Sequence, residues 1–312
     1  MWLSLQVVSC NENDALEKEI QQVDVRLEMV RFDQLFADAT PQTLGSLKAE
    51  FPYLFPKQIP DSVWVATMRD TLQIQLQEAL DKTFPANEEL GDELHDTYQH
   101  LKYYFPEFTA PKVITMTTDV DYREKIIYTD SLVLVGLDTY MGDGHEMYQG
   151  IPLYIQQNMK PSQITQDIVE QFARRAISQP KTRNFLDQMV YYGKILYLKE
   201  KILPQSTDAE KIGYTQEQLE WATENEGQIW KYFIENEVLY DTDPRLKERF
   251  INMAPFSKFN LALDPESPPR LGQYIGWQIV KEYAEKSNAR LKPLLITDAE
   301  TIFNQSKFKP GQ

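Results

Sequence analysis

Carboxylates and a histidine gather in one short segment of the chain. Residues 138–146 read Asp-Thr-Tyr-Met-Gly-Asp-Gly-His-Glu and directly follow an apolar stretch rich in β-branched residues. Carboxylate oxygens are the ligands that calcium prefers, and a His-Glu pair begins the zinc motif His-Glu-x-x-His. We expect a solvated, glycine-containing loop, which is a common location for recognition. The alternative is a partner or ion site formed by four of its side chains: Asp138, Asp143, His145 and Glu146.

Both metal motifs fail in this segment when they are read residue by residue. The second zinc-binding histidine would fall at position 149, where the chain has Gln149. An EF-hand loop needs Asp or Asn at its third and fifth positions, and counted from Asp138 these are Tyr140 and Gly142. The chain has 3 histidines in all. We therefore predict neither a metal nor a cofactor.

A second pair of carboxylates lies in a segment that is predicted to be a helix, residues 164–176. Asp167 and Glu170 lie at i and i+3, so they share one face of that helix. Paired carboxylates act as general acid and base when the pKa of one of them is raised. We predict a residual pocket at Asp167 and Glu170 without any assigned catalytic residue. The alternative is an atypical envelope hydrolase, peptidase-like or glycan-cleaving, that works through carboxylates.

Other motifs for chemistry are missing or conflict with their surroundings. The chain has no P-loop and no Gly-x-Ser-x-Gly. Ser178 and Lys181 match Ser-x-x-Lys, but Pro180 interrupts the helix that such a pair needs. Gly272 and Gly276 have the spacing that lets two helix backbones approach closely, and we predict that they serve core packing.

The elements that must position these residues are mostly helices. Alternating or β-branched apolar residues predict strands at 23–29, 113–117, 125–128 and 132–135, and their short connections predict a small, mostly antiparallel sheet. Apolar residues at helical spacing predict helices over these stretches: 41–51, 61–84, 90–105, 164–176, 186–203, 215–233 and 271–283, with a last helix starting at Asp298. The expected fold is a predominantly helical α+β fold, with a single domain over residues 23–312.

The lone cysteine, Cys10, stands where an apolar stretch changes to a polar one. Residues 1–9 are apolar or uncharged and end in Val-Val-Ser, whereas residues 11–22 are mainly polar. This is the pattern of a lipobox, in which the cysteine receives acyl chains such as palmitate that anchor a protein to a membrane. We predict a truncated lipoprotein signal peptide at 1–10, lipidation at Cys10 and a polar tether at 11–22. The expected location is the cell envelope, facing the periplasm.

The charge of the chain excludes some partners. The 32 Lys and Arg residues against 47 Asp and Glu residues give a formal net charge of −15. Nucleic acid requires a basic face, so we predict no nucleic-acid partner. The same charge disfavours direct adhesion to anionic lipid, so membrane attachment should depend on the acyl chains.

Several strings of residues, taken together and in order, resemble one family. Among them are Tyr53-Leu54-Phe55-Pro56, His100-Leu101-Lys102-Tyr103-Tyr104-Phe105-Pro106, Val133-Leu134-Val135-Gly136-Leu137-Asp138-Thr139-Tyr140, Tyr192-Gly193-Lys194-Ile195-Leu196-Tyr197 and Gly272-Gln273-Tyr274-Ile275-Gly276-Trp277. The chain resembles the gliding-motility lipoprotein GldB family of Bacteroidota from about residue 20 to its C-terminus. The resemblance also implies an architecture distantly like that of zinc metallopeptidases, without the metal motif.

The resemblance implies a function at the level of the cell. It implies an envelope lipoprotein that is required for gliding, with other gliding or secretion envelope proteins as partners. It supplies no catalytic residue. We therefore expect a non-catalytic scaffold or assembly factor, anchored to the membrane through its lipid.

Overall fold

The protein is described by a computed structural model over residues 7–262 and 264–310. Contacts between Cα atoms divide it into two compact units. Unit 1 contains the chain up to Gln99 together with residues 108–151 and 159–164, and unit 2 contains residues 100–107, 152–158 and 165 onward. The described residues form sixteen α-helices and four strands, which confirms the predominantly helical α+β class. The single domain expected over residues 23–312 stays a prediction.

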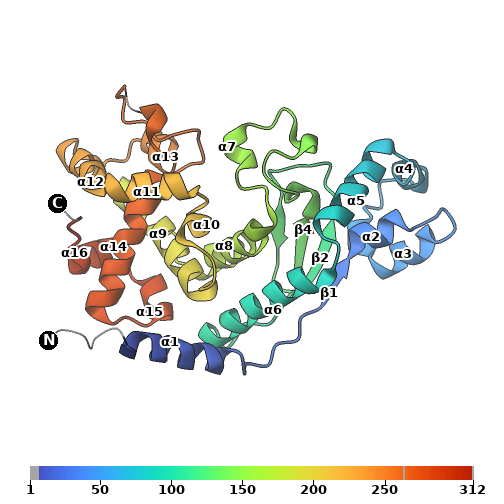
Figure 1. The fold of residues 1–312 in the computed structure, drawn as a ribbon, viewed down its shortest axis with the longest axis horizontal. Helices are drawn as coiled ribbons and strands as arrows, with labels where there is room; N and C mark the ends of the chain where they lie inside the picture. Colours follow the sequence, from blue (N-terminus) through green and yellow to red (C-terminus); the bar gives the residue numbers. More distant parts are fainter. Residues whose placement is uncertain (1–6, 263, 311–312) are drawn as a thin grey trace. The chain divides into compact units, whose positions relative to one another are not determined.

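Unit 1 is built around a four-stranded mixed sheet with the order β1-β2-β4-β3 (Figure 1). Its strands are β1 (Met29–Arg31), β2 (Lys112–Met116), β3 (Ile126–Tyr128) and β4 (Leu132–Gly136). β2 pairs in parallel with β1 on one side and with β4 on the other, whereas β3 pairs antiparallel with β4. Val113 of β2 and its partner Val133 of β4 are fully buried, so the centre of the sheet is the apolar core of this unit.

The prediction of a mostly antiparallel sheet is wrong, because two of the three pairings are parallel. The chain between β1 and β2 includes five helices, which is ample for the crossover that a parallel pair requires. The short connection from β2 to β3, residues 117–125, does not form a hairpin, because β4 takes the place beside β2. β1, β2 and β4 therefore end at the same edge of the sheet.

The strand predicted at 23–29 is also wrong, since β1 begins only at Met29. Residues 23–28 do alternate between half-buried and exposed, as their apolar pattern predicted. Their backbone carbonyls, however, are bonded by side chains of a helix. Gln99 Nε2 donates to the carbonyls of Gln21 and Val23, both at 3.0 Å, and His95 Nε2 lies 3.2 Å from the carbonyl oxygen of Val25.

Unit 1 has two helices, over residues 61–67 and 71–83, where the sequence predicted a single helix over 61–84. Its α-helices are α1 (Val7–Ile20), α2 (Phe32–Ala37), α3 (Leu44–Glu50), α4 (Asp61–Thr67), α5 (Thr71–Thr83) and the greater part of α6 (Asn87–Tyr104). The helix predicted over 61–84 is interrupted because Asp70 caps α5 and accepts a hydrogen bond from the Leu72 amide at 2.8 Å. Most of the segment predicted as a polar tether, 11–22, belongs to α1, whose last residue Ile20 is buried.

In the described part of unit 2, all regular secondary structure is helical. Its α-helices are α7 (Leu153–Gln156), α8 (Ile164–Ala176, from its second residue), α9 (Phe185–Ile202), α10 (Asp208–Ile212), α11 (Gln216–Glu224), α12 (Glu226–Glu235), α13 (Arg245–Phe250), α14 (Leu271–Ser287), α15 (Leu291–Ile296) and α16 (Ala299–Ser306). α14 packs along α9, and α16 packs against both (Figure 1). The predicted helix 164–176 is confirmed, and Asp298 caps α16 as predicted.

None of the described helices combines the length and the apolar character that crossing a bilayer demands.

Candidate functional site

Asp138, the first residue of the predicted recognition loop, is fully buried, and three donors bind its carboxylate. It lies in the 3-10 turn Leu137–Thr139 that follows β4. Its Oδ2 accepts hydrogen bonds from the amides of Thr118 at 2.9 Å and Val120 at 2.8 Å, and its Oδ1 accepts one from the Thr118 hydroxyl at 3.0 Å. All three donors belong to the connection from β2 to β3. Asp138 thus fastens that connection to the end of β4.

The part of the β2–β3 connection that binds Asp138 has a backbone conformation that ordinary residues seldom adopt. Asp119 and Val120 have φ angles of 55° and 59°. For a β-branched residue such as Val120 this conformation is strained, at a cost on the order of 1–3 kcal/mol. Burial raises the pKa of Asp138, while the hydrogen bonds from Thr118 and Val120 oppose that rise. Asp138 thus holds a strained turn through three hydrogen bonds, which is a structural role.

The other three residues of the predicted loop site do not converge on Asp138. Asp143 and Glu146 are exposed, and His145 is half-buried. The Nδ1 atom of His145 accepts a hydrogen bond from the Met147 amide at 3.2 Å, which begins the 3-10 turn Glu146–Tyr148. Within this loop, which the structure describes throughout, no three acidic or imidazole side chains come close enough together to hold a metal ion.

Tyr148 closes this loop through hydrogen bonds of its hydroxyl group. No pattern in the sequence predicted this role. Its ring is buried, and its hydroxyl donates to the carbonyl of Asp138 at 3.1 Å. The same hydroxyl accepts from the Met141 amide at 2.7 Å. The loop is therefore held across its base by one side chain.

Glu170, on α8 in unit 2, forms a cluster of ion pairs. Its carboxylate lies 2.7 Å from Arg174 Nη2, one turn later, and 3.0 Å from Lys199 Nζ on α9. Burial alone would raise the pKa of Glu170, but the charges of Lys199, Arg174 and Arg270 outweigh it and hold that pKa well below its usual range. This carboxylate is ionised and pairs α8 with α9.

The structure does not pair Asp167 with Glu170. The Glu170 carboxylate is bound by cations, and Asp167 is half-buried one turn away on the same helix. Gln166, the residue before Asp167, was not singled out from the sequence. It is fully buried, and neither its amide nitrogen nor its amide oxygen has a hydrogen-bond partner.

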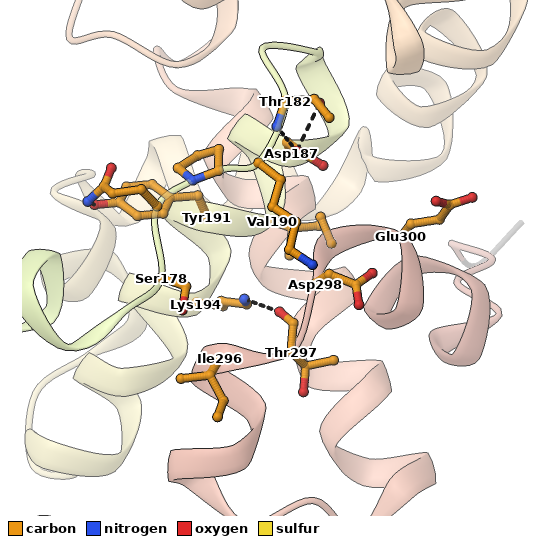
Figure 2. A pocket seen from close by; sticks show the side chains of 14 residues that line it. Ser178, Thr182, Asp187, Val190, Tyr191, Lys194, Ile296, Thr297, Asp298 and Glu300 are labelled. Atoms are coloured by element: carbon orange, nitrogen blue, oxygen red, sulfur yellow. Dashed lines mark hydrogen bonds between the residues drawn. The ribbon is translucent and has the colours of Figure 1, made fainter.

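A buried lysine, Lys194, lines a cavity in unit 2 (Figure 2). It is not among the site residues predicted from the sequence. Lys194 projects from α9, and the residue is 4% exposed. Its Nζ donates to the carbonyl of Leu295 at 3.1 Å and, more closely, to that of Thr297. Both carbonyls lie where α15 ends and α16 is about to begin, so the amine joins α9 to this turn.

The cavity in front of Lys194 is small and has charges of both signs in its walls. Its volume is about 190 Å³, and it lies between α9, the loop before α9 and the turn from α15 to α16. Besides Lys194, four charged residues line it: Lys181, Asp187, Asp298 and Glu300. The Asp187 carboxylate accepts from the amide and the hydroxyl of Thr182, at 2.8 and 2.9 Å.

The surroundings of Lys194 lower the pKa of its amine below that of an ordinary lysine. Burial lowers the pKa of Lys194 to about 8. The negative charges of Asp298 and Asp187 raise this pKa, whereas the positive charge of Lys181 lowers it further. Among the described residues, no carboxylate forms an ion pair with Lys194, and its amine is bound by two carbonyl oxygens.

One signal in the sequence does point to Lys194. It stands four residues after the buried Val190 and four before the buried Leu198, so it occupies a position on the apolar face of α9. A lysine at such a position must find polar partners in the interior. Ser178 and Lys181, which matched Ser-x-x-Lys, line the same cavity, and Pro180 between them lies in the loop that separates α8 from α9.

The lipidation site lies at the limit of what the structure describes. Cys10 falls within the first half of α1, but its side chain and residues 1–6 lie outside the described part. Lipidation of Cys10 and the signal peptide therefore stay predictions.

The arrangement is that of a helical α+β protein in which hydrogen bonds hold the buried carboxylate of Asp138 and ion pairs hold the half-buried carboxylate of Glu170. A family model described as gliding motility protein GldB matches residues 13–310, so the chain belongs to the GldB family. This confirms the resemblance found in the sequence and implies a part in gliding motility. Comparison with curated proteins and with solved structures returns no match.

Proposed function

We propose that this protein is a lipid-anchored component of the cell envelope that acts in gliding as a non-catalytic scaffold or assembly factor. Its partners are other envelope proteins of the gliding or secretion apparatus. The acyl chains on Cys10 attach it to the membrane, because each buried methylene contributes roughly 0.8 kcal/mol and two or more chains give a stable anchor.

The observation that carries the non-catalytic part is that the carboxylates of Asp138 and Glu170 are both bound by other residues of the protein. Asp138 is bound by three donors of the β2–β3 connection, and Glu170 is bound by Arg174 and Lys199. General acid–base catalysis needs a carboxylate that can exchange a proton with a substrate within hydrogen-bond reach. Both carboxylates instead accept hydrogen bonds from other residues of the protein, which supports a structural role.

The anchoring part is tested by replacing the cysteine. A gliding host carries Cys10→Ala or Cys10→Ser in place of the wild-type chain. We expect the variant protein to leave the membrane fraction and gliding to be lost. Wild-type fractionation and gliding in both variants would contradict the lipid anchor.

Replacing the exposed carboxylates Asp143 and Glu146, and separately the half-buried Asp167, distinguishes a scaffold from an enzyme. Asp143→Asn combined with Glu146→Gln, and Asp167→Asn by itself, are introduced at normal protein abundance. A scaffold keeps gliding in both strains. Loss of gliding in either one, with unchanged abundance and circular dichroism, would favour the hydrolase.

Partners are sought directly by light crosslinking of cells that carry a C-terminally tagged chain. We expect an envelope protein to co-purify at near-equal amount and to persist at high salt. If several crosslinkers of different length capture no envelope protein, the scaffold is contradicted.

A further inference from the structure

The two hydrogen bonds of the Lys194 amine leave one tetrahedral direction of its nitrogen without a partner among the described residues. A neutral amine has two N–H groups and one lone pair, and the carbonyls of Leu295 and Thr297 accept two hydrogen bonds from Nζ. When both N–H groups are so used, the lone pair must point in a remaining tetrahedral direction. Lys194 lines the cavity, from which a small molecule can approach its side chain (Figure 2). We propose that Lys194 is a nucleophilic lysine and that this cavity binds a small aldehyde or ketone, with which Lys194 forms an imine.

The charged groups that face Lys194 come from every element around the cavity. They are Lys181 in the loop before α9, Asp187 on α9 itself, Asp298 at the turn from α15 and Glu300 in α16. None of them pairs with the amine, and burial lowers its pKa to about 8. At pH 7 about a tenth of such a lysine is neutral, whereas a lysine of ordinary pKa near 10.4 is neutral in only about one molecule in 2,500.

A second lysine of the same helix shows that burial alone does not make a lysine a candidate nucleophile. Lys199 lies on α9 and is 4% exposed, as Lys194 is. Its Nζ, however, forms an ion pair with Glu170 at 3.0 Å and does not line the cavity. A carboxylate partner favours the ammonium form, which has no lone pair. Lys199 is therefore a matched control within the same molecule.

The size and lining of the cavity define the ligand class. At about 190 Å³ it is smaller than the 300–1,000 Å³ typical of drug-sized ligands, so it admits a molecule of a few carbon atoms. Three residues that carry a hydroxyl group line it: Ser178, Thr182 and Tyr191. These groups suit a carbonyl compound that also carries a hydroxyl group.

The chemical step is an addition followed by loss of water. The Nζ lone pair attacks the carbonyl carbon, and the carbonyl oxygen takes up a proton to give a carbinolamine. The carbon–oxygen bond then breaks, and the oxygen leaves as water with both former amine hydrogens. Nothing is oxidised or reduced, and the product is an imine between Lys194 and the ligand carbon.

The test uses the full chain and glycolaldehyde, a two-carbon hydroxyaldehyde. Purified protein is incubated with glycolaldehyde and cyanoborohydride, which reduces the imine to a stable adduct, and each lysine is quantified by peptide mass spectrometry. We expect Lys194 to be modified at least about tenfold faster at pH 7 than the exposed Lys231. Its rate should level off above about pH 8. Lys199 should stay unmodified.

Two variants separate the cavity from general reactivity. Ala299→Phe places a ring in the cavity wall and should abolish modification of Lys194 while leaving the rate at Lys231 unchanged. Lys194→Arg should remove the fast-reacting site without creating another. Modification of wild-type Lys194 no faster than Lys231 at pH 7, or as slowly as Lys199, would overturn the proposal. Fast modification that persists in a folded Ala299→Phe variant would overturn the assignment of the cavity.

Discussion

The backbones of Gly193 and Gly276 meet where α9 and α14 pack together. A β-carbon on Gly193 would overlap the carbonyl of Gly276 and approach the Trp277 amide nitrogen to 2.7 Å. A β-carbon on Gly276 would overlap the carbonyl of Met189. The predicted core role of Gly276 is confirmed, because it is buried in the contact between these two helices.

Gly276→Ala should therefore strongly destabilise the protein. The added methyl group meets backbone atoms, which cannot rotate away, so the two helices must separate. Overpacking of a core costs about 1–3 kcal/mol and more where backbone must move, so we expect a loss of about 3 kcal/mol in the free energy of unfolding. Urea denaturation followed by circular dichroism measures it.

Gly45→Ala is the matched control. Gly45 also lies inside a helix, α3, but a β-carbon there would meet no atom within 4 Å. Alanine is the better helix former, so this change should leave stability unchanged or raise it by up to about 1 kcal/mol. Equal effects of the two substitutions would contradict the close contact between α9 and α14.

Glu170→Gln should destabilise the protein at neutral pH. The change leaves Lys199, whose side chain is 5% exposed, without its carboxylate partner. Removing one member of a buried ion pair costs about 3–5 kcal/mol, and the Glu170 side chain is 27% exposed, so we expect about 2–3 kcal/mol. Glu235→Gln, in an exposed pair with Lys231, should change stability by less than about 0.5 kcal/mol.

The effect of Glu170→Gln should depend on pH in a defined direction. The pKa of Glu170 is lower in the folded protein than in the unfolded chain, where it is near 4.5. Its contribution is therefore fully present above about pH 4.5 and is lost as the pH falls from there toward the folded-state pKa. Denaturation of both proteins at pH 7, 5 and 4 should give a constant difference between pH 7 and 5 and a smaller one at pH 4. A difference that grows as the pH falls would contradict the pairing.

Asp138→Ala should loosen the connection between β2 and β3. The amides of Thr118 and Val120 lose their acceptor inside the protein, and the strained turn loses the contact that holds it. Hydrogen bonds to a charged group contribute about 1.5–3 kcal/mol each, so we expect a loss of at least about 3 kcal/mol. Asp143→Ala, in the exposed part of the same loop, should have an effect within about 0.5 kcal/mol. Hydrogen exchange at residues 117–125 should accelerate only in the first variant.

The sequence was informative where local periodicity decides the structure. The helices around Asp167 and Gly276 follow from the spacing of apolar residues, and so does the alternating exposure of residues 23–28. The pairing of strands did not follow, because the direction of a ladder depends on which strand inserts beside β2, and β4 lies between β2 and β3.

The candidate sites show the same division between local and distant interactions. Asp138 was found because it follows an apolar strand, but its three donors come from a segment about 20 residues earlier in the chain. Lys194 was missed because its two acceptor carbonyls lie more than 100 residues away in the sequence. Local pattern indicates that a polar residue is buried, whereas only the fold shows which groups satisfy it.

Lys194→Met should reveal the buried amine through alkaline pH. In the folded protein the pKa of Lys194 is about 8, and in the unfolded chain it is near 10.5. The unfolded chain therefore binds more protons between these values, so the wild-type protein gains stability relative to Lys194→Met as the pH rises from 8 to 10.5. A difference of 2.5 pKa units corresponds to about 3 kcal/mol. Urea denaturation of both proteins at pH 7 and 10.5 measures this gain, and Lys231→Met, at an exposed position, should show none. A gain of the same size for both lysines, or a loss for Lys194, would mean that its amine is not held in a desolvated site.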